Sequence, residues 1–187
     1  MIHAEKVVDA QGLACPMPIV KTKQAITDMQ AGQVIEVQAT DKGSKADLAA
    51  WSKSAGHQYL GTIEEGEVLK HYLRKSSNDD SLERKHPHTI GNQTLKNKIA
   101  EDAQLLVLDV REKAEYAFDH IPGAVSIPLG EIDSRMTEVD PNKNVYIVCR
   151  TGSRSNLAAQ KLAANGYKQV YNVVPGMSEW DGQTDSN

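Results

Sequence analysis

Two cysteines, Cys15 and Cys149, are the side chains of this chain best suited to nucleophilic chemistry. They are far apart in sequence and lack the CxxC or Cys/His spacing of a zinc site, so we expect neither a metal nor an organic cofactor. In a reducing compartment both should be free thiols. A lone cysteine is more often a small buried apolar residue, so the case for reactivity depends on the residues around each one.

The residues after Cys149 are typical of an anion-binding loop. Cys149 ends a continuous apolar run, and a short glycine-containing loop leads from it into a predicted helix. The backbone N–H groups of such a loop can point at one spot and, with the positive end of the helix dipole, bind an anion. Guanidinium groups from Arg150 or Arg154 would also favour the thiolate over the thiol. We therefore expect Cys149 to be a nucleophile, with the substrate-binding residues Arg150, Thr151, Gly152, Ser153 and Arg154.

The length of this loop separates two kinds of chemistry. From Cys149 to Arg154 the pattern is C-x4-R, one residue shorter than the C-x5-R loop with which cysteine phosphatases and arsenate reductases surround a tetrahedral oxyanion. A tighter ring suits a thiolate carrying one extra sulfur atom better than it suits a phosphate. Phosphatase or arsenate reductase activity is therefore disfavoured.

Cys15 lies immediately before a predicted helix. It precedes Pro16, and proline is favoured at the first helical position while the residue before it is pushed out of helical angles. Cys15 is thus expected to be the N-cap, where unpaired amides and the helix dipole would lower the pKa of its thiol. Lys21 and Lys23 add positive charge nearby, although a solvated helix face explains them equally well.

The elements that must hold these cysteines fall into two groups. The stretch from Arg74 to His88 has almost no apolar residues, so we predict a domain at 1–75, a flexible linker at 76–86 and a second domain at 87–183. The chain has 25 acidic and 21 basic residues, with no long basic tract, so nothing favours nucleic acid or an anionic membrane as a partner. No apolar run approaches a membrane span, and the charged N-terminus is unlike a signal peptide, so a cytoplasmic location is expected.

Hydrophobic periodicity predicts a different architecture for each domain. The first should be a two-layer sandwich in the order β-α-β-α-β-β, with elements at 6–10, 16–29, 33–39, 44–56, 57–63 and 67–73. In the second, the continuous apolar runs at 104–109 and 144–149 are typical of strands buried on both faces of a parallel sheet. With helices at 112–118 and 155–165 and a strand at 169–173, this indicates a three-layer α/β domain with reactive groups at the carboxyl ends of its strands.

The second domain resembles a single-domain rhodanese. The matching segments are LLVLDVRE at 105–112, Glu115-Tyr116, HIPGA at 120–124, CRTGSRS at 149–155 and GMSEW at 176–180. The resemblance implies that Cys149 becomes a persulfide, that the loop amides stabilise its terminal sulfur, and that Asp109 and Arg111 brace the site, although they could equally be a structural ion pair. His120 is expected to be a packing residue. The segment 174–177, usually rich in glycine, departs from the pattern and could change access to the pocket.

The first domain is similar to the TusA sulfur carriers. The segment VDAQGLACPMP at 8–18, with Lys23 following, carries the signature, and the likeness weakens at Lys42-Gly43, where Pro-Gly is common. The resemblance implies a persulfide on Cys15 and supports Pro16 as a structural residue. The alternative is an ordinary capped helix whose cysteine is incidental.

Together these features predict a sulfurtransferase of two thiols. Cys149 would take sulfur from a small sulfane-sulfur donor such as thiosulfate, a polysulfide or a low-molecular-weight persulfide. It would relay this sulfur to or from Cys15, which would pass it to a protein acceptor or receive it from a protein donor. The direction of transfer stays open. A rival hypothesis is a non-catalytic redox or persulfide sensor in which Cys15 and Cys149 react to change partner contacts.

Overall fold

The computed structural model describes residues 2–77 and 86–187. The chain divides into two compact units, Met1–Asn78 and Asp79–Asn187, each with its own sheet. Most of the predicted linker, residues 78–85, lies outside the described residues. His86, predicted to end the linker, already packs in the second unit, where its backbone N–H donates to Asn156 Oδ1 at 2.8 Å. Within the described residues, no helix has the length and apolar content to span a bilayer.

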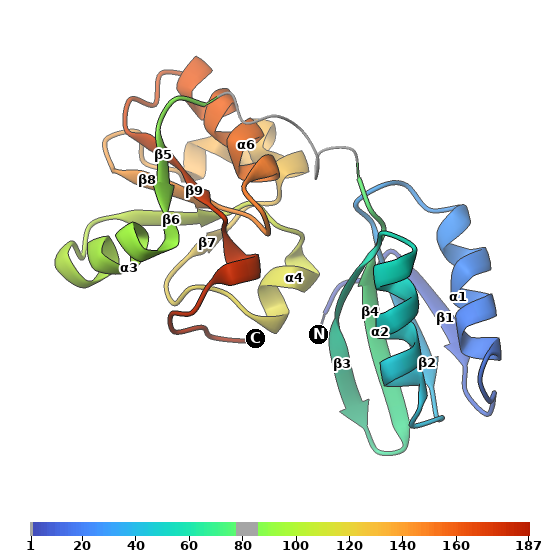
Figure 1. Ribbon diagram of the computed structural model, residues 1–187. Coiled ribbons are helices and arrows are strands. Elements are labelled where there is room, and N and C mark those ends of the chain that lie inside the picture. The colour runs from blue at the N-terminus through green and yellow to red at the C-terminus, as the bar shows by residue number, and fades with distance from the viewer. Residues whose placement is uncertain (1, 78–85) are drawn as a thin grey trace. The chain divides into compact units, whose positions relative to one another are not determined.

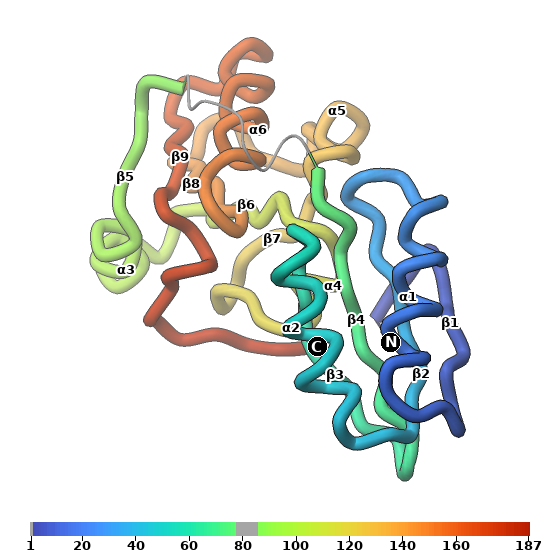
Figure 2. Tube along the Cα trace, turned by 45° about the vertical axis from the view of Figure 1, so that its right-hand side comes forward, coloured from blue at the N-terminus to red at the C-terminus, as the bar shows by residue number. Residues whose placement is uncertain are grey.

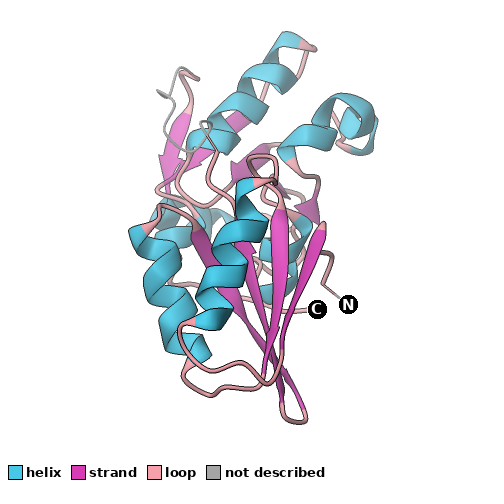
Figure 3. Ribbon diagram, turned by 90° about the vertical axis from the view of Figure 1, so that its right-hand side faces the viewer, coloured by secondary structure: helices cyan, strands magenta, loops and turns pink. Residues whose placement is uncertain are grey.

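The first unit is a two-layer sandwich. Its elements in chain order are β1 (Lys6–Ala10), α1 (Met17–Thr27), β2 (Val34–Ala39), α2 (Ser44–Ser54), β3 (Gln58–Glu65) and β4 (Val68–Arg74). The strands lie in the order β1-β2-β4-β3, with β1 parallel to β2 and the other neighbours antiparallel. Both helices cover one face of the sheet (Figure 1 and Figure 3). The predicted order β-α-β-α-β-β is confirmed.

The core of this unit follows from the alternation of side chains along the strands. Ile35 and Val37 of β2 point toward the helices and pack with Ile26 of α1 and Leu48 of α2. Side chains at alternate positions of the strand therefore pack one face of the sheet against the two helices. Because β1 and β2 are parallel, the loops that follow them emerge at the same end of the sheet.

The second unit is a three-layer α/β domain. Its main elements are β5 (Thr89–Gly91), α3 (Asn92–Glu101), β6 (Leu106–Asp109), α4 (Lys113–Phe118), β7 (Val125–Ser126), α5 (Ile132–Arg135), β8 (Val145–Val148), α6 (Ser153–Ala164) and β9 (Val170–Val174). The strands lie in the order β5-β9-β8-β6-β7, and every neighbouring pair is parallel (Figure 2). The predicted three-layer α/β class is confirmed.

Two cores, one on each face of this sheet, explain the continuous apolar runs. Ile147 of β8 packs with Ala158 of α6 and Ile132 of α5, whereas its neighbours Tyr146 and Val148 pack on the face that holds α3. Every residue of the strand is buried, so no polar alternation is possible. Because the strands are parallel, the loops that follow β6, β8 and β9 gather at one edge of the sheet.

Several elements had no clear signal in the sequence. β5 and β7 have only three and two residues, too few to show a period. α3 reads NQTLKNKIAE, in which few residues are apolar, and it is held by the packing of Leu95 on the sheet rather than by a strong amphipathic pattern. These three elements complete the domain, together with the predicted strands β6, β8 and β9.

Candidate functional site

Cys149 lies between the carboxyl end of β8 and the start of α6. Its side chain is buried, with 1% of its surface exposed. The backbone N–H of Gly152 donates a hydrogen bond to Cys149 Sγ at 3.1 Å. Gly152 has φ +96°, a left-handed conformation that favours glycine and that turns this N–H toward the sulfur. The Gly152 N–H is thus a loop amide in direct contact with the Cys149 sulfur.

A chain of polar side chains continues from the sulfur. Ser155 Oγ lies 3.2 Å from Cys149 Sγ and donates to Asn172 Oδ1 at 2.6 Å. Asn172 Nδ2 donates to the carbonyl of Gly152 at 3.1 Å, which fixes the orientation of the amide. Ser155 Oγ therefore lies between the sulfur and the amide of Asn172. Rotation of the serine hydroxyl would give a thiolate a second donor.

Two backbone carbonyls of the loop accept hydrogen bonds from the segment after β9. Met177 N–H donates to the carbonyl of Cys149 at 2.8 Å, and Ser178 N–H donates to that of Arg150 at 2.9 Å. A side chain on Gly176 would bring its Cβ within 2.4 Å of the Cys149 carbonyl oxygen, so only glycine permits this approach. The segment that departs from the rhodanese pattern, residues 174–177, thus lies directly against the loop.

Arg154 does not face solvent. Its guanidinium makes two hydrogen bonds to the carboxylate of Glu115 in α4, at 2.7 and 3.0 Å, and both side chains are almost fully buried. Its positive charge is thus matched by Glu115, which the sequence indicated only as part of a segment that resembles the rhodaneses. Of the other predicted substrate-binding residues, Arg150 is exposed, Thr151 is half-buried and Ser153 is buried.

Asp109 and Arg111 form a buried ion pair. Arg111 Nη2 donates to Asp109 Oδ2 at 2.7 Å and to the carbonyl of Asp119 at 2.6 Å, which ties the end of β6 to the end of α4. Burial opposes the charge of Arg111, but attraction to Asp109 outweighs it and raises the pKa of Arg111. His120 stacks on Tyr116 with ring centroids 3.8 Å apart and is buried, in keeping with the expected packing role.

Cys15 differs from its prediction in two ways. The first is its position, because α1 begins at Met17 with Pro16 as the N-cap, so Cys15 precedes the cap rather than forming it. Ala14 to Met17 form a turn in which Met17 N–H donates to the carbonyl of Ala14 at 3.0 Å. Cys15 is exposed on this turn. The loop is anchored by Gly12, whose N–H donates at 2.8 Å to Oγ1 of Thr40, the residue after β2.

The second difference is the charge around the thiol. The carboxylate of Asp47, in the first turn of α2, raises the pKa of this thiol, and Asp41, in the loop before α2, adds a smaller contribution. The predicted lowering of the pKa was wrong because both carboxylates come from sequence positions distant from Cys15. The ammonium group of Lys21 donates to the carbonyl of Asp9 at 3.0 Å.

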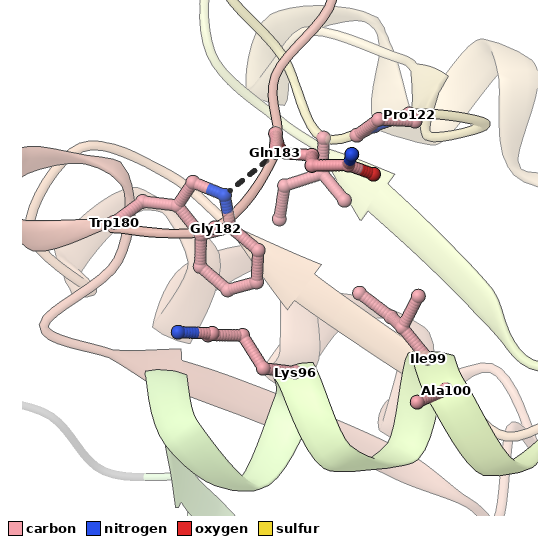
Figure 4. Close-up of a pocket in the computed structure, with 8 residues that line it drawn as sticks. Lys96, Ile99, Ala100, Pro122, Trp180, Gly182 and Gln183 are labelled. Atoms are coloured by element: carbon pink, nitrogen blue, oxygen red, sulfur yellow. Dashed lines mark hydrogen bonds between the residues drawn. The ribbon is translucent and has the colours of Figure 1, made fainter.

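A separate pocket of about 330 Å³ lies in the second unit between α3 and the C-terminal segment (Figure 4). Its lining is mostly apolar and consists of Lys96, Ile99, Ala100, Ile121, Pro122, Trp180, Gly182 and Gln183. Lys96 pairs with Asp181 at 3.0 Å, and Trp180 Nε1 donates to the carbonyl of Gln183 at 3.1 Å. The lining contains no residue of the Cys149 loop. Among the residues that the structure describes, no group of three His, Cys, Asp or Glu side chains could hold a metal ion.

Comparison with known proteins assigns both units. Residues 6–75 match the family model described as "Sulfurtransferase TusA", and residues 92–183 match the one described as "Rhodanese-like domain". The chain is 51% identical over 185 residues to "Putative sulfur carrier protein YrkF" of Bacillus subtilis, covering 99% of this chain and 100% of that protein. Over 74 residues, 40% of this chain, it is 57% identical to "Putative sulfur carrier protein YrkI" of the same organism, of which it covers 99%.

A solved structure supports the fold of the second unit. The crystal structure of a rhodanese-like domain protein from Staphylococcus aureus superposes with a TM-score of 0.51 at 35% identity, covering 54% of this chain and 98% of that one. Together with the end-to-end match to a protein of the same length, these likenesses support sulfur transfer as the activity. The chain therefore belongs to the family of proteins that join a TusA sulfur-carrier domain to a rhodanese-like domain.

Proposed function

We propose that this protein takes sulfane sulfur as a persulfide on Cys149 and relays it to or from Cys15, which exchanges it with another protein. The observation that carries the proposal is the setting of Cys149 Sγ, which receives the Gly152 N–H at 3.1 Å and lies 3.2 Å from the Ser155 hydroxyl. Both groups can donate to a thiolate or to an anionic persulfide, and they need no metal or organic cofactor to do so.

The first transfer is a displacement at divalent sulfur. With thiosulfate, the Cys149 thiolate attacks the outer sulfur, the new S–S bond forms, and the old S–S bond breaks to release sulfite, so atoms and charge balance. A polysulfide or low-molecular-weight persulfide would react in the same way and release a shorter polysulfide or a thiol. The loop bounded by Gly152 and Ser155 would stabilise the terminal sulfur, with Arg150, Thr151, Ser153 and Arg154 as the remaining substrate-binding residues.

The second transfer moves the outer sulfur between the two cysteines. In the forward direction the Cys15 thiolate attacks the outer sulfur of the Cys149 persulfide, Cys149 leaves as a thiolate, and a persulfide remains on Cys15. A flexible linker of the predicted length has a root-mean-square span of about 20 Å and a maximum near 40 Å, enough for transient encounters of the two thiols. Tethering would raise their local concentration to the millimolar range.

The exposure of Cys15 supports a protein partner. Cys15 is exposed on its turn, so a cysteine of another protein can reach it. The two free cysteines also fit a reducing compartment, for which we propose the cytoplasm.

The relay is tested by mapping persulfides with mass spectrometry after brief treatment with thiosulfate or polysulfide. We expect sulfur on both cysteines of the wild type, on Cys149 alone in Cys15→Ser, and on neither in Cys149→Ser. Undiminished labelling of Cys15 in Cys149→Ser would rule out the forward direction. Sustained transfer from thiosulfate to cyanide would support an enzyme, and a single stoichiometric oxidation would support the redox sensor instead.

A further inference from the structure

Asn172 is a fully buried amide in the middle of the apolar strand β9. It lies opposite Ile147 of β8 in the parallel sheet, and Val170, two residues before it, packs in the same core as Ile147 and Cys149. Because side chains alternate along a strand, the amide of Asn172 lies on the face of the sheet that carries Cys149 and α6. A buried amide in such a place needs hydrogen-bond partners.

Both ends of this amide bond to the segment that begins at Cys149. Asn172 Oδ1 accepts from the hydroxyl of Ser155 at 2.6 Å, and Nδ2 donates to the carbonyl of Gly152 at 3.1 Å. The opposite orientation of the amide would set its oxygen against the carbonyl oxygen of Gly152, and two acceptors cannot form a hydrogen bond. The two contacts therefore fix which atom of the amide faces Ser155.

Ser155 has a different kind of partner from other serines on helices of this chain. A hydroxyl on a helix can donate to the backbone carbonyl three or four residues earlier. Three serines on other helices donate to the carbonyl three residues earlier, at 2.8–3.0 Å, namely Ser52, Ser54 and Ser134. For Ser155 the corresponding carbonyl belongs to Gly152, which already accepts from Asn172 and from the N–H of Asn156 at 3.2 Å.

We propose that Asn172 is a positioning residue for sulfur transfer at Cys149, an inference that rests on the proposed role of this cysteine. Its oxygen accepts from the Ser155 hydroxyl, and its NH₂ group occupies the carbonyl to which this hydroxyl would otherwise turn. The serine oxygen is therefore held 3.2 Å from the sulfur, where rotation about the Cβ–Oγ bond alone turns its hydrogen toward a thiolate. Asn172 acts through Ser155 rather than on the sulfur itself.

The test is a cycle of single and double variants in the full chain carrying Cys15→Ser, in which Cys149 is the remaining thiol. Asn172→Ala should let the hydroxyl turn to Gly152 and slow single-turnover persulfide formation from thiosulfate about tenfold, as Ser155→Ala does. The chain with both changes should also be about tenfold slower, because both remove the same donor. A loss of about a hundredfold, the product of two independent effects, would overturn the inference.

Asn156→Ala is the matched control for the loss of a buried amide. Asn156 is also fully buried in this unit, and its Oδ1 accepts from the backbone N–H of His86 at 2.8 Å. Its replacement should leave the rate of persulfide formation unchanged. A rate as low as that of Asn172→Ala would overturn the inference, because the loss of any buried amide would then be enough.

Asn172→Asp is the conservative variant, and it keeps the test decisive if Asn172→Ala does not fold. Aspartic acid keeps an oxygen that accepts from Ser155, and its protonated form also keeps a donor for Gly152. Burial favours the protonated form. At about pH 5.5, Asn172→Asp should therefore load Cys149 at least about threefold faster than Ser155→Ala. Equal rates would overturn the inference.

The pH profile for alkylation of Cys149 by iodoacetamide separates this inference from the proposed function. Loss of the donor should move the midpoint to higher pH by the same amount in Asn172→Ala, Ser155→Ala and the double variant. Unequal midpoints among these variants would overturn the inference whether or not Cys149 takes up sulfur. Equal shifts, with no persulfide on Cys149 in any chain, would overturn the proposed function and leave Asn172 as the residue that positions Ser155.

Discussion

Cys149 and Cys15 both precede a helix, yet the protein surrounds them with opposite kinds of groups. Cys149 receives a backbone N–H and lies beside a serine hydroxyl, and both groups can donate to an anion. Cys15 is exposed, and the carboxylate of Asp47 raises the pKa of its thiol, which favours the neutral form. A helix N-terminus by itself therefore does not determine the chemistry of a cysteine. The groups that other elements bring to it decide whether the thiol or the thiolate is favoured.

The two sites also depend on different parts of their units. The Cys149 loop is held by buried ionic and polar contacts from α4, β9 and the segment after β9. The loop that leads to Cys15 is held at Gly12, whose N–H donates to Thr40 Oγ1. Three experiments, given from the largest expected effect to the smallest, test this difference between the two units.

The largest effect is expected for Glu115→Ala. It removes the carboxylate that pairs with the buried Arg154 and should lower the free energy of unfolding of the second unit by about 3–5 kcal/mol. Urea unfolding followed by Trp180 fluorescence in a Trp51→Phe chain measures this unit alone. Asp181→Ala, which removes the exposed partner of Lys96, is the control and should cost less than about 1 kcal/mol. Equal losses in the two variants would contradict a structural role for the buried pair.

An intermediate effect is expected from pH on the first unit. Burial, with a smaller contribution from Lys45, lowers the pKa of His71 to about 4 from its ordinary value of 6.5. The folded state therefore binds this proton less readily than the unfolded state. The resulting stability is fully present above pH 6.5 and is lost as the pH falls toward 4, by about 3 kcal/mol over the whole window.

This pH dependence can be measured by urea unfolding followed by Trp51 fluorescence in a Trp180→Phe chain at several pH values. His71→Gln, which keeps a neutral side chain with a donor and an acceptor, should flatten the loss between pH 6.5 and 4. Carboxylates elsewhere contribute equally to both proteins, so the difference isolates His71. The same slope in both proteins would show that His71 is not the titrating group.

The smallest effect is expected for Ser155→Ala. Loss of the hydroxyl beside Cys149 removes one donor to the thiolate and should slow formation of the Cys149 persulfide about tenfold, corresponding to about 1.4 kcal/mol. Single-turnover reaction with thiosulfate measures this step. Ser134→Ala, on the exposed surface of α5, serves as the control. An unaltered rate in Ser155→Ala would mean that the loop amides alone support the anion.

The sequence was informative for structural features that depend on residues close together along the chain. The buried runs before Asp109 and Cys149 predicted the parallel sheet, and alternation in residues 33–39 predicted a strand covered on one face. The polar residue Asn172 inside the apolar strand β9 was a usable signal of the network behind Cys149, because a buried amide requires partners. Nothing in the local sequence around Cys15 pointed to Asp47.

The sequence by itself determined the two domains' fold classes and singled out the two cysteines as candidate nucleophiles, because periodicity, loop composition and motif are local properties of the chain. Tertiary structure alone decided the electrostatic setting of each thiol. Asp47 reaches Cys15, and Glu115 matches Arg154, only after helices distant in sequence have packed on their sheets. Charges act through space over a few ångströms, so their effect on a thiol depends on folded distance and not on separation along the chain.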